Sequence, residues 1–189
     1  LKRFLNKKII LVEVGIGNGG SLFMWRKFFG KRAQIIGIEL NPDAKKLEKY
    51  GFKIFIGDQS DPNFWKNFYK KIGKIDILID DGGHTNLQQI TALMESIENI
   101  KNNGLIIIED THTSFMNYKG FKNPSDYSLI NFTNKIIENL HRRNPMVKKN
   151  MNLFSKKISS IEYFDSIVLI KISKKKYSLS KNLHNNKKL

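Results

Sequence analysis

Short apolar runs rich in β-branched residues alternate with amphipathic segments along the first two thirds of the chain. Turn residues bound each run, so we predict five strands. These strands are Ile9–Val14, Gln34–Glu39, Lys53–Ile56, Asp76–Asp80 and Leu105–Glu109. Strands that alternate with helical segments are typical of β-α-β units, in which the strands run parallel. The pattern therefore predicts an α/β fold with a doubly wound, mostly parallel sheet.

Capping residues mark where the intervening helices begin. Asn41-Pro42-Asp43 and Asp61-Pro62 each place a capping side chain before a proline in the first turn, and Gly51 ends the first of these helices. A third helix is predicted from Asn86 to about Lys101, ended by Asn103-Gly104. One of its faces carries Leu87, Ile90, Leu93, Met94 and Ile97. This spacing predicts that the face packs in the hydrophobic core.

The pattern weakens after the fifth strand. Residues 111–155 contain scattered aromatic and polar residues and one predicted helix, from about Ser128 to Leu140, so we interpret them as a lid-like insertion. Ile158–Tyr163 and Ser166–Ile172 then predict an antiparallel hairpin at the sheet edge, which brings the sheet to seven strands. We expect one domain over residues 1–172, followed by a basic, flexible tail over residues 173–189.

Composition excludes several classes of protein. A chain of 189 residues with 40% hydrophobic content is sufficient for one core. The absence of cysteine excludes disulfides, thiolate metal sites and a cysteine nucleophile. No apolar run reaches the roughly 18 to 20 residues that a membrane span needs, and we expect a cytoplasmic protein.

The net charge of +16 would suit a polyanionic partner. However, lysine, asparagine and isoleucine are abundant throughout the chain, including helices with no site nearby, which indicates a compositional bias. No arginine-rich stripe and no motif of mixed aromatic and basic residues accompanies the charge. We therefore do not expect a nucleic-acid partner.

The predicted first strand leads directly into a glycine-rich turn. Gly15, Gly17 and Gly20 match the spacing G-x-G-x-x-G, with Asn18 between them. Such a turn lets backbone amides approach a ligand at the N-terminus of a helix. Nicotinamide and flavin enzymes use the same spacing, so the turn by itself indicates only a cofactor that contains adenosine.

Acidic residues at the strand ends narrow the choice of cofactor. Glu39 ends the second strand, where a carboxylate can accept hydrogen bonds from both ribose hydroxyls of an adenosine. Glu13 precedes the turn, where it would repel a pyrophosphate but suits an amino group and a sulfonium cation. Asp58, followed by Gln59, lies where a side chain could accept from the adenine amino group. Loop capping by Glu13 or Asp58 is the alternative interpretation.

Acidic residues also follow the fourth and fifth strands. The fourth ends in Asp80-Asp81-Gly82-Gly83-His84 and the fifth in Glu109-Asp110-Thr111-His112. The carboxyl ends of neighbouring parallel strands meet at one sheet edge, about 4.8 Å apart, so these carboxylates can share one cation. Oxygen ligands without cysteine favour magnesium, with manganese or calcium as alternatives. A structural alternative is that Asp81 or Asp110 caps its loop.

The acidic residue, single spacer and glycine-rich turn together resemble the first motif of class I S-adenosylmethionine-dependent methyltransferases. The resemblance extends from about Ile9 to Ile172, and it implies a Rossmann-like sheet with a terminal hairpin. It implies S-adenosylmethionine as the cofactor. The residues that we expect to bind it are Glu13, Gly15, Gly17, Asn18, Gly20, Glu39, Asp58, Gln59 and Asp80.

Asp-Asp-Gly-Gly-His and Glu-Asp-x-His-Thr-Ser also resemble the macrolide O-methyltransferases and their sugar-modifying relatives. That resemblance implies Asp81, Glu109 and Asp110 as magnesium ligands and His84 as the general base. It also implies methyl transfer to a hydroxyl of a sugar or a sugar-containing small molecule. The sequence departs from the pattern because it lacks the large N-terminal region of those enzymes, and its lid-like insertion has no recognisable substrate motif.

Two other functions stay open at this stage. One is an RNA methyltransferase that uses the basic surface, and the other is an NAD-binding oxidoreductase or a non-catalytic nucleotide-binding domain. The acceptor, the role of His112 and the oligomeric state, including a homo-oligomer, also stay open.

Overall fold

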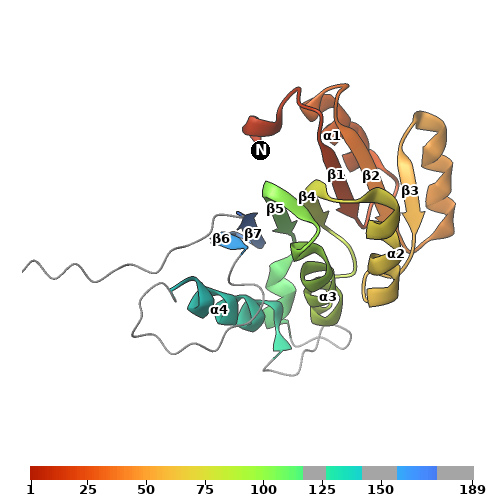
Figure 1. Ribbon diagram of the computed structural model, residues 1–189. Helices are drawn as coiled ribbons and strands as arrows, with labels where there is room; N and C mark the ends of the chain where they lie inside the picture. The colour runs from red at the N-terminus through yellow and green to blue at the C-terminus, as the bar shows by residue number, and fades with distance from the viewer. Residues whose placement is uncertain (117–126, 142–156, 174–189) are drawn as a thin grey trace, which may run out of the picture.

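One seven-stranded mixed sheet forms the centre of the computed structural model, which describes residues 1–116, 127–141 and 157–173 (Figure 1). Its strand order is β3-β2-β1-β4-β5-β7-β6. The strands are β1 Ile10–Val14, β2 Gln34–Glu39, β3 Lys53–Ile56, β4 Ile75–Asp80, β5 Ile100–Ile108, β6 Ile158–Phe164 and β7 Ile167–Ile172. The first five pair in parallel, whereas β7 runs antiparallel to β5 and β6. This confirms the predicted α/β sheet with its antiparallel hairpin.

Helices cover both faces of the sheet. The α-helices are α1 Gly20–Phe29, α2 Pro62–Ile72, α3 Asn86–Ile97 and α4 Leu129–Leu140, and the 3-10 helices are η1 Lys2–Phe4, η2 Pro42–Tyr50 and η3 Thr111–Phe115. In β1, Leu11 packs in the cluster with α1 and η2, whereas Val12 packs in the cluster with α2, α3 and α4. This alternation follows from the two-residue period of a strand, and it makes the fold doubly wound.

The predicted caps are present at two helices. Asn41 Oδ1 accepts from the amide of Asp43 at 2.9 Å, and Asp61 Oδ1 accepts from the amide of Asn63 at 2.8 Å. Gly51, with a φ of 80°, ends the first of these helices as expected. The segment Pro42–Tyr50 is nevertheless a 3-10 helix throughout.

The third predicted helix was too long. Helix α3 ends at Ile97, and β5 already begins at Ile100, whose side chain is buried in the core. Gly104 therefore lies inside β5 and does not terminate a helix. A Cβ at this position would lie 2.6 Å from the carbonyl oxygen of Asp76, so the close packing of two strands requires the glycine.

The predicted core face of α3 was also only partly right. Leu93 and Ile97 are buried, but Leu87 and Met94 are 68% and 41% exposed. Polar residues occupy part of the buried face instead, and hydrogen bonds such as that from Tyr69 Oη to Ser96 Oγ at 2.7 Å offset part of the cost of their burial. Hydrophobicity alone does not reveal such partners.

The lid-like insertion and the tail are described only in part. Helix α4 confirms the predicted helix, and it packs against α3, β6 and η3. Residues 117–126 and 142–156 of the insertion, and 174–189 of the tail, lie outside the described residues, so the domain limits stay a prediction. Across the part that is described, no helix combines the length and the hydrophobicity that crossing a bilayer requires.

Candidate functional site

A cleft of about 330 Å³ opens at the carboxyl ends of the central parallel strands. Parallel strands of an open α/β sheet direct their following loops to one edge, which is where such folds bind ligands. The cleft is lined by the last residues of β1 and β2, by the loops after β1, β2, β3 and β4, and by one residue of α3: Val14, Gly15, Gly17, Ile38, Glu39, Leu40, Gly57, Asp58, Gln59, Asp81, Gly82, Gly83 and Gln88. The structure thus brings most of the predicted cofactor residues to one cleft.

The glycine-rich turn after β1 depends on three residues with positive φ. Gly15 has a φ of 79°, and a Cβ there would lie 2.1 Å from the carbonyl oxygen of Asp81. Gly17 has a φ of 48° and faces open space, while Gly19, with a φ of 83°, packs on Leu47. Gly20 begins α1 without a positive φ. The sequence motif therefore missed Gly19, because its spacing does not show which glycine forms the left-handed cap.

Glu39 connects the turn to the end of β2. Its Oε2 accepts from the amide of Gly17 at 3.0 Å, and its Oε1 accepts from the amides of Leu40 and Asn41. Asn18 lines a neighbouring hollow of about 210 Å³ together with Glu39. The carboxylate is therefore held in place at the boundary of the two hollows.

Asp58 and Gln59 follow β3, the strand that lies next to β2 at the edge of the sheet. Asp58 is exposed, and its Oδ1 accepts from both the amide and the hydroxyl of Ser60. Gln59 is buried, and its amide joins two segments: Nε2 donates to Asp80 Oδ1 at 2.9 Å, and Oε1 accepts from the amide of Gly83 at 2.8 Å. Gln59 thereby attaches the β3 loop to the β4 loop.

Glu13 and Asp80 are buried and do not line the cleft. Both oxygens of Glu13 accept hydrogen bonds from α1, from Ser21 Oγ at 2.7 Å and from Trp25 Nε1 at 3.0 Å. Burial raises the pKa of Glu13 above its ordinary value, although these two bonds oppose the shift. A direct contact of Glu13 or Asp80 with a cofactor stays a prediction.

Asp80 should make the stability of the fold depend on pH. Burial raises the pKa of Asp80 to about 7 from an ordinary 3.8, against the opposing hydrogen bonds from Gln59 and Gly82. The folded state then holds a proton that the unfolded state has lost, so the free energy of unfolding should fall as pH rises from about 4 to about 7. Asp80→Asn keeps an acceptor for Gln59 and removes this contribution. Denaturant unfolding in EDTA measures the free energy of unfolding of the wild-type chain and the variant from pH 4 to pH 8. This free energy should fall with rising pH in the wild type relative to the variant, and an equal pH dependence in both proteins would contradict the assignment.

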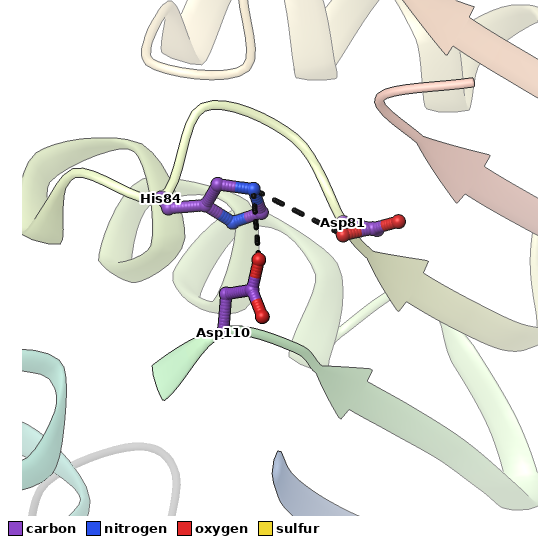
Figure 2. Close-up of side chains that lie close together, drawn as sticks. All are labelled: Asp81, His84 and Asp110. Carbon is purple, nitrogen blue, oxygen red and sulfur yellow. Dashed lines mark ion pairs between the residues drawn. The ribbon is translucent and has the colours of Figure 1, made fainter. Parts of the chain in front are cut away.

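Three side chains from two neighbouring strand ends converge beside the cleft (Figure 2). His84 Nε2 lies 3.4 Å from Asp110 Oδ2 and 3.9 Å from Asp81 Oδ1. One ligand atom from each residue lies within 4.8 Å of the other two. We name these three residues the metal group. Asp81 lines the cleft as well, so the metal group and the cleft share a residue.

The backbone of the metal group is strained in two places. His84 has a φ of 57° and Asp110 a φ of 53°, a conformation that residues other than glycine seldom adopt. Thr113 Oγ1 donates to the carbonyl oxygens of both residues at 2.9 Å and so joins the two loops. Strain of this kind persists where the surroundings enforce it, and it concentrates at functional sites.

The charges of the metal group suit a cation. Burial raises the pKa of Asp81, and the charge of Asp110 raises it further, against the effect of His84. Burial also raises the pKa of Glu109, followed by the charges of Asp81, Glu13 and Asp110. Glu109 lies near these carboxylates but is not part of the metal group. The side chains of Asp81 and Asp110 are about half exposed, and their carboxylates repel one another. A hard divalent cation would relieve this repulsion, because carboxylate oxygens are the ligands that such a cation prefers.

His112 and Ser166 complete the surroundings of Asp110. His112 Nδ1 lies 3.9 Å from Asp110 Oδ1 and 2.6 Å from Ser166 Oγ. Ser166 belongs to the turn between β6 and β7 and was not singled out from the sequence. No local pattern could have shown it, because it is 54 residues from His112.

The chain is similar in sequence to curated O-methyltransferases. It is 29% identical over 146 residues to 8-demethyl-8-alpha-L-rhamnosyl tetracenomycin-C 2'-O-methyltransferase of Streptomyces olivaceus, covering 73% of this chain and 38% of that enzyme. It is 33% identical over 132 residues to demethylmacrocin O-methyltransferase of Streptomyces fradiae, covering 66% of this chain and 32% of that enzyme. The chain thus spans well under half the length of these curated relatives. No protein-family model matches it.

Among solved structures, the fold matches MycE methyltransferase from the mycinamycin biosynthetic pathway, in a complex with Mg, SAH and mycinamycin VI. The TM-score is 0.82 at 23% sequence identity, over 92% of this chain and 46% of that one. The likeness confirms the predicted Rossmann-like α/β fold.

Proposed function

We propose that the chain carries out S-adenosylmethionine-dependent, metal-assisted methyl transfer to a hydroxyl of a sugar or sugar-containing small molecule. The observation that carries the proposal is the position of Asp81, which belongs both to the cleft that would hold the cofactor and to the metal group. A methyl donor and a cation-held hydroxyl would therefore lie side by side, as transfer between them requires. Its sequence relatives are O-methyltransferases, and one of them is named as acting on a rhamnosyl tetracenomycin, which supports this reaction.

The cleft suits S-adenosylmethionine as the methyl donor. Glu39 lies at the end of β2, where its carboxylate can accept from the ribose hydroxyls, and Gly17 leaves open space beside it. Both bonds from Ser60 go to Oδ1 of Asp58, so Oδ2 can accept from another donor. This supports the predicted contact with the adenine amino group. A divalent cation would be held by Asp81 and Asp110, with Glu109 as the predicted third ligand.

His84 would take the proton from the acceptor. When bound, the cation supplies a Lewis acid that favours the deprotonated form of a hydroxyl. The hydroxyl oxygen forms a bond to the methyl carbon while the bond from that carbon to sulfur breaks, and the sulfonium becomes a neutral thioether. The proton of the hydroxyl goes to His84 Nε2, the ring nitrogen that faces the carboxylates. His84 Nδ1 is buried without a hydrogen-bond partner among the described residues, so Nε2 is the accessible nitrogen.

Calorimetry tests the cofactor directly. S-adenosylhomocysteine should bind the wild-type chain, whereas NAD should not, because a pyrophosphate would lie near the acidic residues of the cleft. Addition of magnesium with a glycosylated acceptor and S-adenosylmethionine should then yield a methylated product, detected by mass spectrometry. Binding of NAD in preference to S-adenosylhomocysteine would favour the oxidoreductase alternative and overturn the proposal.

Glu39→Ala should weaken the binding of S-adenosylhomocysteine. The two ribose hydroxyls lose a charged acceptor, which costs about 1.5 to 3 kcal/mol, or roughly 10- to 100-fold in affinity. Calorimetry measures this change, with Glu48→Ala as a control, since Glu48 is an exposed acid on η2 that does not line the cleft. Unchanged affinity in a folded Glu39→Ala protein would remove Glu39 from the cofactor site.

A further inference from the structure

We infer that Ser166 is a positioning residue of the metal group: through His112, it orients the carboxylate of Asp110. The inference rests on the proposed function, because it takes Asp110 to be a metal ligand. It gives the hairpin of β6 and β7, which contributes no side chain to the metal group itself, a part in forming that group.

Two contacts attach the turn of this hairpin to η3. The carbonyl oxygen of Ser166 accepts from the amide of Thr111 at 3.0 Å, and Ser166 Oγ is hydrogen-bonded to His112 Nδ1 at 2.6 Å. Ser166 itself has a φ of 58°. A serine keeps this unfavourable conformation only where its surroundings enforce it, and here both its carbonyl and its hydroxyl contact the loop that carries Asp110.

The carboxylate of Asp110 lies between two histidines. Oδ2 is 3.4 Å from His84 Nε2, and Oδ1 is 3.9 Å from His112 Nδ1. Rotation of the carboxylate would change both distances at once. A His112 ring that is held by Ser166 therefore restricts the orientation in which Asp110 presents Oδ2 to the rest of the metal group.

Ser166, His112 and Asp110 also contain the residue types of a hydrolase triad, but the geometry excludes that role. In a triad, the serine and the carboxylate contact opposite nitrogens of the imidazole, so that the ring transfers a proton between serine and substrate. Here both Ser166 Oγ and Asp110 Oδ1 lie nearest to the same atom, His112 Nδ1. The arrangement holds the ring in place and does not activate the serine.

A calorimetric titration of the full chain with Mn²⁺ tests the inference. Ser166→Ala removes the hydroxyl and leaves the backbone unchanged, and Ser166→Gly removes it while accepting a φ of 58° without strain. Both should bind Mn²⁺ about tenfold more weakly, as expected when a residue that orients a metal ligand is lost. Affinity for S-adenosylhomocysteine should not change, because Ser166 does not line the cleft.

Two further comparisons separate positioning from a general structural role. Ser159→Ala is the matched control, since Ser159 lies in the same hairpin and its hydroxyl donates to the carbonyl of Lys171. Mn²⁺ affinity should stay at the wild-type value in this variant. In a double-mutant cycle, His112→Ala should weaken Mn²⁺ binding, and Ser166→Ala should add nothing to it, because Ser166 acts through His112.

The outcomes distinguish the inference from the proposed function. If the wild-type chain binds Mn²⁺ and both Ser166 variants bind it equally well, the inference is overturned while the proposed function stands. The inference is also overturned if Ser166→Gly retains the affinity that Ser166→Ala loses, or if the two losses in the cycle are additive. A wild-type chain that binds no Mn²⁺ overturns both.

Discussion

Asp110→Asn should lower methyl transfer severely while the affinity for S-adenosylhomocysteine is retained. The substitution removes one of the two carboxylates of the metal group, and the charge that holds a cation there falls accordingly. Even substitutions beyond the ligands of a metal site cost about 10- to 100-fold in affinity or activity, so the loss of a ligand should cost at least about 100-fold in turnover. Higher magnesium should restore part of the activity, since the remaining ligands still bind the ion weakly.

Removal of the metal should reproduce this effect in the wild-type chain. Excess EDTA should stop turnover, and magnesium should restore it, whereas cofactor binding should persist because the cation is proposed to hold the acceptor. Asp61→Asn is the control for the amide substitution, since Asp61 is an exposed cap of α2 and asparagine caps equally well. Full activity in excess EDTA would refute metal assistance.

His84→Ala should lower turnover by about 10² to 10⁴, the usual contribution of a positioned general base. His84 Nε2 faces both carboxylates of the metal group and is the ring nitrogen available to the acceptor. Only a neutral imidazole can accept the proton, so the pH profile of turnover should also change in the variant. Steady-state kinetics with S-adenosylmethionine at several pH values measures both effects.

The same variant distinguishes a base from a ligand. His84 lies close enough to Asp81 and Asp110 to bind a cation itself. If His84 is a base, His84→Ala should retain most of the Mn²⁺ affinity while turnover falls. If His84 is a metal ligand, the variant should lose Mn²⁺ affinity and turnover together. His141→Ala, at an exposed histidine just after α4, is the control for loss of an imidazole. Wild-type turnover in His84→Ala would make His84 structural.

The alternation of apolar runs and capped segments was sufficient to predict the sheet. Six of the seven strands lie within one residue of their predicted bounds, because their runs are short, β-branched and bounded by turn residues. Strand β5 instead begins at Ile100, five residues before its predicted start at Leu105. The clearest error, the end of α3, came from Asn103-Gly104. These residues look like a helix terminator, yet a close approach of β4 to β5 uses the glycine inside a strand.

The sequence also placed the site, since parallel strands carry the residues after them to a common edge. Glu39, Asp58 and Asp81 meet at one cleft for this reason. Sequence order could not show which of the collected acids come closest together. The structure brings His84 to Asp81 and Asp110, whereas Glu109, adjacent to Asp110 in the chain, is not part of the metal group.

The sequence by itself thus determined the order of elements, the sheet edge where the cleft lies and the residue types gathered there, because these depend on the period and polarity of neighbouring residues. Only the tertiary structure decided the backbone conformation of the loops and the contacts between them. The left-handed backbones of His84 and Asp110 are stabilised by a hydroxyl of Thr113, and the hairpin turn reaches His112 across 54 residues. Such contacts form between segments that the fold brings together, so their geometry depends on the packing of the whole sheet and not on any local pattern.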